Sequence, residues 1–259
     1  QIPEVGLALA AKAAKINGVY SAMALLDLDT AKAKKYADTK SVKEESGYTS
    51  PFCYPLWPCD RVGEYILAKS AVAGAMIQYM ASDNEDVPNQ SPSNHLLGVG
   101  GQCLEDGTEV YLDQDQANTV NGYGVTTAIN QNGYRLWGNY TGAYPASSDA
   151  KDIWFAVRRM FSWQGNNFIQ TYFDEVDDPM NNVLVQSVVD SENIRCSAYA
   201  PKYWAGASIE YKSDDNPKTA ILAGTMKFRQ HIAPYTPAQE IVDIIDYDTD
   251  TLAAAVGGN

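Results

Sequence analysis

The apolar positions along this chain recur with two different spacings. In several stretches they return every three or four residues, which is the period of a helix with one buried face. The longest such stretch covers residues 149–173, where Ile153, Val157 and Met160 begin a stripe that continues to Tyr172. This spacing predicts helices over residues 4–16, 31–43, 70–81, 114–121 and 149–173, and a further helix with Pro179 in its first turn.

Other stretches are apolar throughout or alternate between apolar and polar residues, as strands do. Residues 19–28 are almost entirely apolar and predict a buried strand, whereas residues 40–47 predict a loop. Residues 48–57 contain Pro51 and Pro55, so we expect an extended segment at a sheet edge or in a loop. Further strands are predicted at residues 64–67, 96–101, 104–112, 203–212, 219–232 and 241–247.

Helical and strand-like stretches alternate along the chain, which predicts an α/β (α+β) fold with a mixed β-sheet flanked by helices. Residues 241–247 are expected to form an extended C-terminal strand or arm. We expect one core domain over residues 1–248, and a division into two subdomains near residue 90 or 200 is left open. Residues 249–259 are small, acidic and end in glycine, so we expect a flexible tail.

Composition narrows the classes of partner and cofactor. The net charge of −13 argues against nucleic acid, because phosphate binding needs a basic surface. No apolar run reaches 18 residues, so no membrane insertion is indicated. Four cysteines and two histidines lack zinc spacing, so we expect reduced thiols, no metal and no cofactor. The chain starts at Gln1 without a methionine, from which we expect that it was cut from a longer protein.

One stretch, residues 121–141, combines several strong local signals. Gly122 and Gly124 permit backbone conformations that other residues avoid. Residues 125–129 form a short β-prone run, and residues 131–133 (Gln-Asn-Gly) are a strong turn signal. Residues 134–137 then predict a second strand that ends at Gly138. The stretch therefore predicts a strand, a tight turn and a strand, which by itself indicates no function.

The same residues resemble the signature of the contractile tail sheath family of phage tails and R-type bacteriocins. The matching positions are Gly124-Val125, Ile129-Asn130, Gly133-Tyr134-Arg135, Trp137-Gly138 and Thr141, followed by the helix motif from Ile153 to Arg158-Arg159. Weaker similarities lie at residues 71–74, 91–94, 206 and 233–239, so the resemblance covers residues 46–246. Three positions depart from the family pattern: Lys69, Ser93 and Tyr140.

The resemblance implies a structural, non-enzymatic protein without a cofactor. Many copies would polymerise as stacked, six-fold rings around an inner tail tube, would contact the baseplate and the tail terminator, and would contract to drive the tube through the host envelope. The protein would be made in the host cytoplasm and would belong to the virion tail. The residues that carry the family motif are Gly124, Asn130, Gly133, Arg135, Trp137, Gly138, Thr141, Arg158 and Arg159.

Two features keep alternative interpretations open. Arg158 and Arg159 either lie along the helix surface or form ion pairs within or between subunits. The closing strand either ends the internal sheet or joins a sheet of a neighbouring copy, as the family's arms do. Its apolar residues are Ile241, Val242, Ile244, Ile245 and Tyr247.

Two other functions remain in competition. An acidic α/β hydrolase would use a carboxylate pair that includes Asp174 or Asp177, in a concave pocket. A capped helix start explains the same acidic run without catalysis. A baseplate or tube protein of the same machine matches the motif of residues 121–141 less well.

Overall fold

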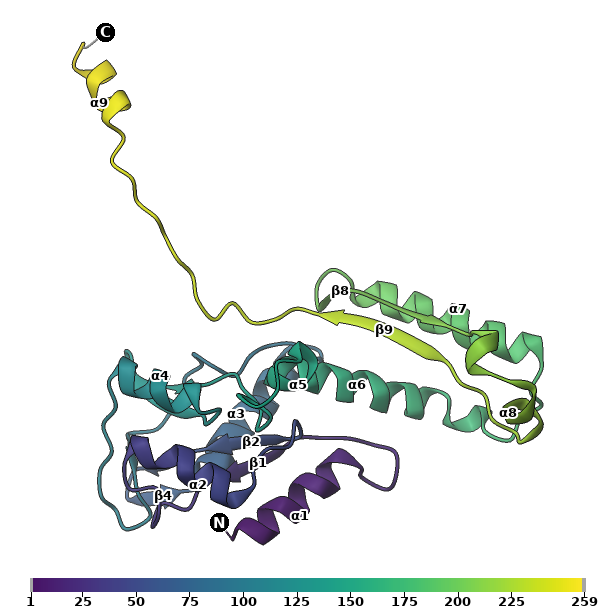
Figure 1. The fold of residues 1–259 in the computed structure, drawn as a ribbon, viewed down its shortest axis with the longest axis horizontal. Helices are drawn as coiled ribbons and strands as arrows, with labels where there is room; N and C mark the ends of the chain where they lie inside the picture. Colours follow the sequence, from purple (N-terminus) through teal and green to yellow (C-terminus); the bar gives the residue numbers. More distant parts are fainter. Residues whose placement is uncertain (1, 258–259) are drawn as a thin grey trace.

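The computed structural model describes residues 2–257, and Figure 1 shows three parts. A broad body carries the first five helices and seven strands. An elongated lobe, formed by α6, α7, α8, β8 and β9, extends from one side of it. The last part is an arm that leaves the end of β9, runs away from both and ends in α9.

The helices of the described residues are α1 (Pro3–Ala14), α2 (Thr39–Ser46), α3 (Lys69–Asp83), α4 (Gln114–Gly122), α5 (Ala150–Ile153), α6 (Phe155–Thr171), α7 (Asn182–Tyr199), α8 (Lys218–Leu222) and α9 (Thr249–Ala255). The strands are β1 (Ala24–Asp27), β2 (Cys53–Leu56), β3 (Cys59–Val62), β4 (Tyr65–Leu67), β5 (Gly101–Cys103), β6 (Thr127–Asn130), β7 (Tyr134–Trp137), β8 (Trp204–Glu210) and β9 (Arg229–Pro234). The α/β class is confirmed.

The strands form four small sheets with both parallel and antiparallel pairs. β1 pairs with β2 in parallel, β3 lies between β4 and β5, and β6–β7 and β8–β9 are antiparallel pairs. The first and third sheets also meet, because the amide of Thr126 donates to the carbonyl of Pro55 at 2.8 Å and that of Trp57 donates to Thr126 at 2.9 Å. The predicted hairpin therefore extends the parallel pair.

Three groups of buried side chains form the core. Their largest members are Leu26, Tyr48 and Trp57 in the first group, Tyr54, Leu136 and Phe155 in the second, and Met160, Tyr203 and Trp204 in the third. Helix α6 supplies Phe155 to the second group and Met160 to the third. This one helix therefore connects the body to the lobe. The proposed division into subdomains near residue 90 or 200 stays a prediction.

Several predicted boundaries are wrong in the first third of the chain. The helix expected over residues 31–43 is replaced by a 3₁₀ turn at Tyr36–Asp38 and by α2, which occupies the expected loop at residues 40–47. Gly47 ends α2 in the left-handed conformation, with φ of 68°. The segment of residues 48–57 is not at an edge, because β2 is fully buried between β1 and Thr126. Pro55 fits there because its carbonyl, rather than an amide hydrogen, faces Thr126.

The long predicted helix over residues 149–173 is interrupted at Trp154, and Gly165 lies uninterrupted inside α6. Trp154 has an extended backbone that separates α5 from α6. Helix α7 begins at Asn182 under an Asn181 cap, so Pro179 precedes its first turn. The strand expected over residues 219–232 divides into α8 and the shorter β9.

The predicted helices at residues 4–16, 70–81 and 114–121 and the predicted strands at 64–67 and 203–212 are confirmed, apart from shifts at their ends. The strand predicted over residues 19–28 is shorter and corresponds to β1. The strands predicted at residues 96–101 and 104–112 are wrong, because the structure has one strand, β5, between them. Within this copy, residues 241–247 form no strand, and the expected tail contains α9. The last two residues of the predicted tail, 258 and 259, lie outside the described part of the chain.

Candidate functional site

The hairpin β6–β7 depends on glycines at fixed positions. Gly133 has φ of 106°, and its amide donates to Oδ1 of Asn130 at 3.2 Å, so these two residues close the turn together. Gly138 has φ of 153°, and a Cβ there would lie 2.4 Å from Oγ1 of Thr126. Gly124 has φ of 71°, and a Cβ would lie 2.4 Å from the Tyr144 carbonyl oxygen. Side chains other than hydrogen are therefore excluded at Gly124 and Gly138.

Arg135 joins the hairpin to the segment of residues 91–94. Its guanidinium donates to the carbonyls of Asn94 at 2.7 Å and Gln131 at 3.1 Å. Ser93, which departs from the family pattern, accepts a hydrogen bond from the Gly138 amide at 3.1 Å. The structure thus brings together two motif segments that are about forty residues apart in sequence.

Thr141 and Tyr140 connect the hairpin to α5 and to the arm. Thr141 is fully buried, and its amide donates to the Ile153 carbonyl at 2.8 Å. Tyr140 stacks on Tyr144 with ring centroids 3.7 Å apart, and its hydroxyl donates to Oε1 of Gln239 at 2.7 Å. The departure at Tyr140 therefore supplies a hydrogen bond to the start of the arm.

A polar hollow of about 470 Å³ lies between this motif region and the start of the arm. Trp137 lines it and donates from Nε1 to Oδ1 of Asn118 at 2.8 Å. Asn94, Asn121 and Gln239 add amide groups to the wall. Trp137 of the motif, and Ser93 and Asn94 of the weaker similarity, consequently border the point where the chain leaves the folded body.

The paired arginines differ in their surroundings. Arg158 forms an ion pair with Asp152 at 3.2 Å, and its guanidinium lies 4.3 Å from the centre of the Phe52 ring. Arg159 has no ion pair or hydrogen bond to any of residues 2–257, and its guanidinium lies 5.5 Å from the centre of the Phe155 ring. Burial lowers the pKa of Arg159 to about 10, because the charged form loses hydration. Arg158 thus has a partner in its own copy.

Sequence reasoning missed two buried lysines. Lys69 and Asp60 form a fully buried ion pair, which explains why the cation at this departure from the family pattern is tolerated. Burial raises the pKa of Asp60, and Lys69 partly opposes that effect. Lys43 donates to the carbonyls of Tyr123 and Tyr144, and burial lowers its pKa to about 8. A lysine inside an otherwise apolar stretch, with an aspartate nine residues earlier, is the only signal that pointed to the first pair.

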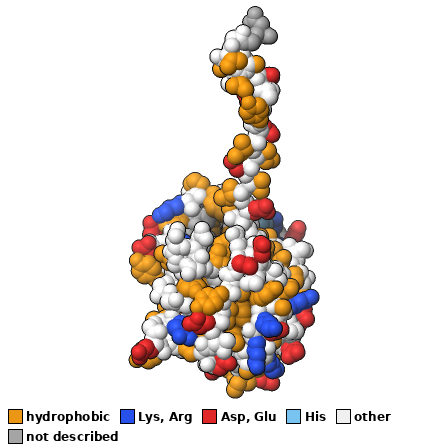
Figure 2. Space-filling model, turned by 90° about the vertical axis from the view of Figure 1, so that its left-hand side faces the viewer, with side chains coloured by type: hydrophobic (Ala, Val, Ile, Leu, Met, Phe, Trp, Pro, Cys, Tyr) orange, Lys and Arg blue, Asp and Glu red, His pale blue; other side chains and the backbone are white. Residues whose placement is uncertain are grey.

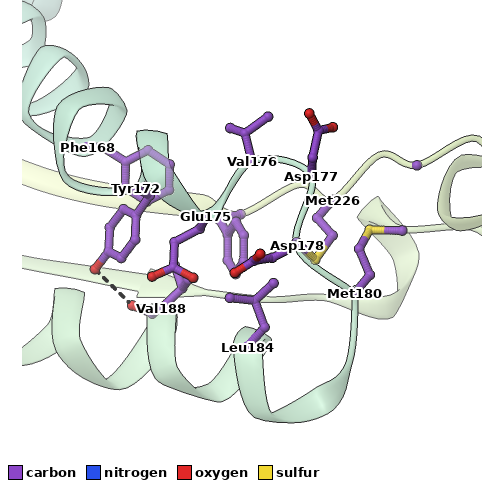
Figure 3. A pocket seen from close by; sticks show the side chains of 12 residues that line it. Phe168, Tyr172, Glu175, Val176, Asp177, Asp178, Met180, Leu184, Val188 and Met226 are labelled. Atoms are coloured by element: carbon purple, nitrogen blue, oxygen red, sulfur yellow. Dashed lines mark hydrogen bonds between the residues drawn. The ribbon is translucent and has the colours of Figure 1, made fainter.

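The acidic run of residues 174–178 does border a hollow, of about 550 Å³, at the far end of the lobe (Figure 3). Glu175, Asp177 and Asp178 lie on its rim, and all three are exposed. Its walls are mainly aromatic and aliphatic, with Phe168 and Leu184 among them. A carboxylate-pair hydrolase would hold its acids inside a concave site, whereas these three are exposed, and the relatives described below do not favour the hydrolase hypothesis.

Other chemical groups are dispersed among residues 2–257. No three His, Cys, Asp or Glu residues there lie close enough to hold a metal ion. The four thiols are free, and burial raises the pKa of Cys59 and Cys196 to about 11. His231 contacts Glu210 at 2.9 Å on the surface. Among the described helices, none has both the length and the hydropathy to cross a membrane.

The arm exposes its apolar side chains, and Figure 2 shows hydrophobic and acidic side chains along it. The exposed fraction is 89% at Ile241, 70% at Val242, 79% at Ile244, 87% at Ile245 and 77% at Tyr247. No residue from 240 to 247 belongs to a helix or strand. Water-exposed apolar residues in a row are typical of a surface that another chain covers.

Comparisons with known proteins agree on one family, although no family model matches the chain. The major tail sheath protein of Serratia phage KSP20 is 27% identical over 197 residues, covering 73% of this chain and 48% of that protein. The tail sheath protein of Escherichia phage P2 is 23% identical over 215 residues, covering 78% and 52%. The chain thus spans about half the length of these curated relatives.

Solved structures share the fold. The anti-feeding prophage baseplate contains a chain with a TM-score of 0.74 at 20% identity, covering 95% of this chain and 65% of that one. The contracted helical sheath of the same particle gives a TM-score of 0.71 at 19% identity, covering 93% and 65%. The resemblance to contractile tail sheath proteins is therefore confirmed.

Proposed function

We propose that this chain, as a relative of contractile tail sheath proteins, is a structural sheath subunit that polymerises around an inner tail tube and has no catalytic activity. The exposed apolar arm, residues 241–247, is the observation that carries the proposal. An isolated monomer gains nothing from exposing this row, whereas a polymer can bury it. The sequence relatives and the shared fold point to the same kind of assembly.

The arm would add a strand to a sheet of a neighbouring copy. Main-chain hydrogen bonds supply the affinity in this mode of recognition, and alternate side chains supply the specificity. Among residues 2–257 the β8–β9 sheet has two strands, so each strand has one edge without a strand neighbour in that part of the chain. Ile241, Val242, Ile244, Ile245 and Tyr247 would be the residues of the added strand.

Copies joined in this way would stack as six-fold rings with the baseplate at one end and the tail terminator at the other. One structural neighbour comes from a baseplate described as six-fold symmetrised, and another from a contracted sheath. Contraction would move folded subunits as rigid bodies, with the arms as flexible links, and would drive the tube through the host envelope. The subunit would be made in the host cytoplasm and would function in the virion tail.

The test is the removal of the arm from the otherwise complete protein. Deleting residues 240–259 should leave a folded monomer that no longer forms striated hollow cylinders in negative-stain electron microscopy. A matched control deletes only residues 249–259, which removes α9 and keeps the apolar row. Cylinders from the control and none from the longer deletion are expected. Normal cylinders from the longer deletion would overturn the role of the arm.

A further inference from the structure

A second hollow, of about 300 Å³, lies where α3, α6 and the segment before β1 meet. Arg159 and Ser162 of α6 line it, and they are three residues apart, so they share one face of the helix. Met23, Ile77 and Trp163 contribute apolar walls. Arg159 is the one cation among the lining residues, which are otherwise apolar or glycine apart from the polar side chains of Ser21, Gln78, Ser162 and Asn166.

Two of these groups, the Arg159 guanidinium and the Ser162 hydroxyl, have no hydrogen-bond or ion-pair partner within the described residues 2–257. The Arg159 guanidinium lies near the Phe155 ring and within electrostatic reach of Tyr54, and it forms no hydrogen bond or ion pair with either. Ser162 is 6% exposed, and its Oγ is buried without a hydrogen bond. A desolvated cation and a buried hydroxyl both cost free energy unless a partner satisfies them. The neighbouring Arg158 differs, because its Nη1 pairs with Asp152 although its Nε is buried without a hydrogen bond.

The amide of Asn166, another polar group of this hollow, is already hydrogen-bonded. Asn166 donates from Nδ2 to the Ser21 carbonyl at 2.8 Å and accepts from the Ser21 amide at 2.9 Å. This pair fixes the segment before β1 against α6. The two unsatisfied groups can both donate to an anion, and an Arg pairs with a carboxylate through two parallel hydrogen bonds. The apolar walls favour a carboxylate that is flanked by aliphatic side chains.

We propose that this hollow receives the Asp243 carboxylate from the arm of a second copy. This inference rests on the proposed function, because it gives the arm a specific contact. In an extended segment, residues two apart point the same way, so Asp243 lies between Ile241 and Ile245. Asp246 lies between Ile244 and Asp248, and Asp248 already caps α9. Asp243 therefore matches a hollow with one cation and apolar walls better than Asp246 does.

The arm is also free to enter a hollow. Several other exposed carboxylates are paired within their own copy, for example Glu85 with Lys202 and Asp215 with Arg229. Asp243 has no ion pair among the described residues, and its segment is outside any helix or strand. The net charge of −13 makes an unpaired, inward-facing arginine a distinctive target for an acidic segment.

The test measures binding of a fluorescent peptide of residues 238–248 by anisotropy. The acceptor is the full chain carrying Asp243→Asn, so that its own arm does not compete. We expect Arg159→Gln in the acceptor to weaken binding at least tenfold, and Asp243→Asn in the peptide to do the same. The two changes together should cost no more than either alone. Arg158→Gln in the acceptor and Asp246→Asn in the peptide are the matched controls and should leave the Kd unchanged.

Three results would overturn the proposal. These are unchanged binding to the Arg159→Gln acceptor, equal effects of the two aspartate changes, and no binding of the unmodified peptide at millimolar concentration. The Tm of Arg159→Gln should be unchanged or higher, because the substitution removes a cation without a partner. A large fall in Tm would show that Arg159 has a partner in its own copy and would also overturn the proposal.

The two proposals can fail separately. If the protein forms cylinders and the peptide binds without dependence on Arg159, the contact is wrong and the sheath role stands. If the peptide binds in the expected charge-dependent way and no cylinders form with or without a tube, the contact stands and the sheath role is wrong. A charge exchange, Arg159→Glu with Asp243→Lys, should restore peptide binding in the first assay if the two residues meet.

Discussion

Replacing Lys69 by methionine tests the buried ion pair between Lys69 and Asp60. Both side chains are fully buried, and Oδ2 of Asp60 already lacks a hydrogen-bond partner. Removing the cation leaves the carboxylate without compensation in a medium that solvates it poorly. Removal of one partner from a buried pair costs about 3–5 kcal/mol. With an m-value of about 3 kcal/mol per M of urea, the unfolding midpoint should fall by about 1–1.7 M.

The assay is urea unfolding of the wild type, Lys69→Met, Asp60→Leu and the double variant. We expect the double variant to recover most of the loss, because two apolar side chains replace the pair without leaving a charge behind. A loss below about 1 kcal/mol for Lys69→Met would refute the reasoning, since this is the range of an exposed pair. A double variant as unstable as the sum of both single variants would also refute it.

The penalty of Lys69→Met should also depend on pH. Burial raises the pKa of Asp60 in the folded state, and Lys69 opposes this rise. Without Lys69 the folded-state pKa rises further above the unfolded value, so the folded variant binds more protons. Its stability is then highest at low pH and falls as the pH rises towards the folded-state pKa. The difference from the wild type should therefore be smaller at pH 5 than at pH 8.

Two further substitutions test other parts of the fold. Gly138→Ala should strongly destabilise the protein in thermal unfolding, because φ at this residue is 153° and the new Cβ would lie 2.4 Å from Oγ1 of Thr126. Gly165→Ala in α6 should instead stabilise the protein by about 0.5–1 kcal/mol, because its Cβ would meet no atom within 4 Å. The reverse order of stability would contradict this account. Burial lowers the pKa of Lys43 to about 8 in the folded state, whereas Lys43 of the unfolded chain stays protonated up to about pH 10.5. Lys43 should therefore add a contribution to the free energy of unfolding of the wild type that rises between pH 8 and 10.5. Lys43→Met should lack this rise, and an identical pH profile for both proteins would exclude Lys43 as its source.

The sequence predicted the elements whose local signals are strong. The hairpin β6–β7 follows directly from the Gln-Asn-Gly turn, where Asn132 and Gly133 both take positive φ. The helices α1, α3 and α4 also lie where the spacing of apolar residues predicts them. Their buried faces were less predictable. Val5 and Leu9 of α1 are exposed at 57% and 47%, while the small residues Gly6 and Ala10 face the core.

The wrong predictions of secondary structure lie where contacts between distant parts of the chain determine the local structure. Helix α2 is polar in composition, yet Thr39, Val42 and Lys43 are buried in it. Burial of a lysine requires carbonyl partners that lie 80 and 101 residues away, and no local pattern contains them. Similarly, β2 is central despite Pro55, because its neighbours β1 and Thr126 come from distant parts of the chain.

The motif residues are predictable from sequence, and their geometry is not. Spacing alone placed Gly133, Arg135 and Gly138 on one hairpin. It did not indicate that Arg135 would bond Asn94, or that Tyr140 would bond Gln239 at the start of the arm. Such contacts depend on how the chain returns to the same place, which local propensities do not contain.

The two aspartates of the arm have a consequence for the free subunit. A run of exposed, β-prone apolar residues with low charge is the pattern from which amyloid-like stacking begins. Asp243 and Asp246 divide the row of residues 241–247 so that no more than two apolar residues are consecutive. Charges placed in this way act as gatekeepers against aggregation, since stacked copies would bring like charges together. The same arm can therefore bind one specific partner through its apolar residues without causing free subunits to aggregate.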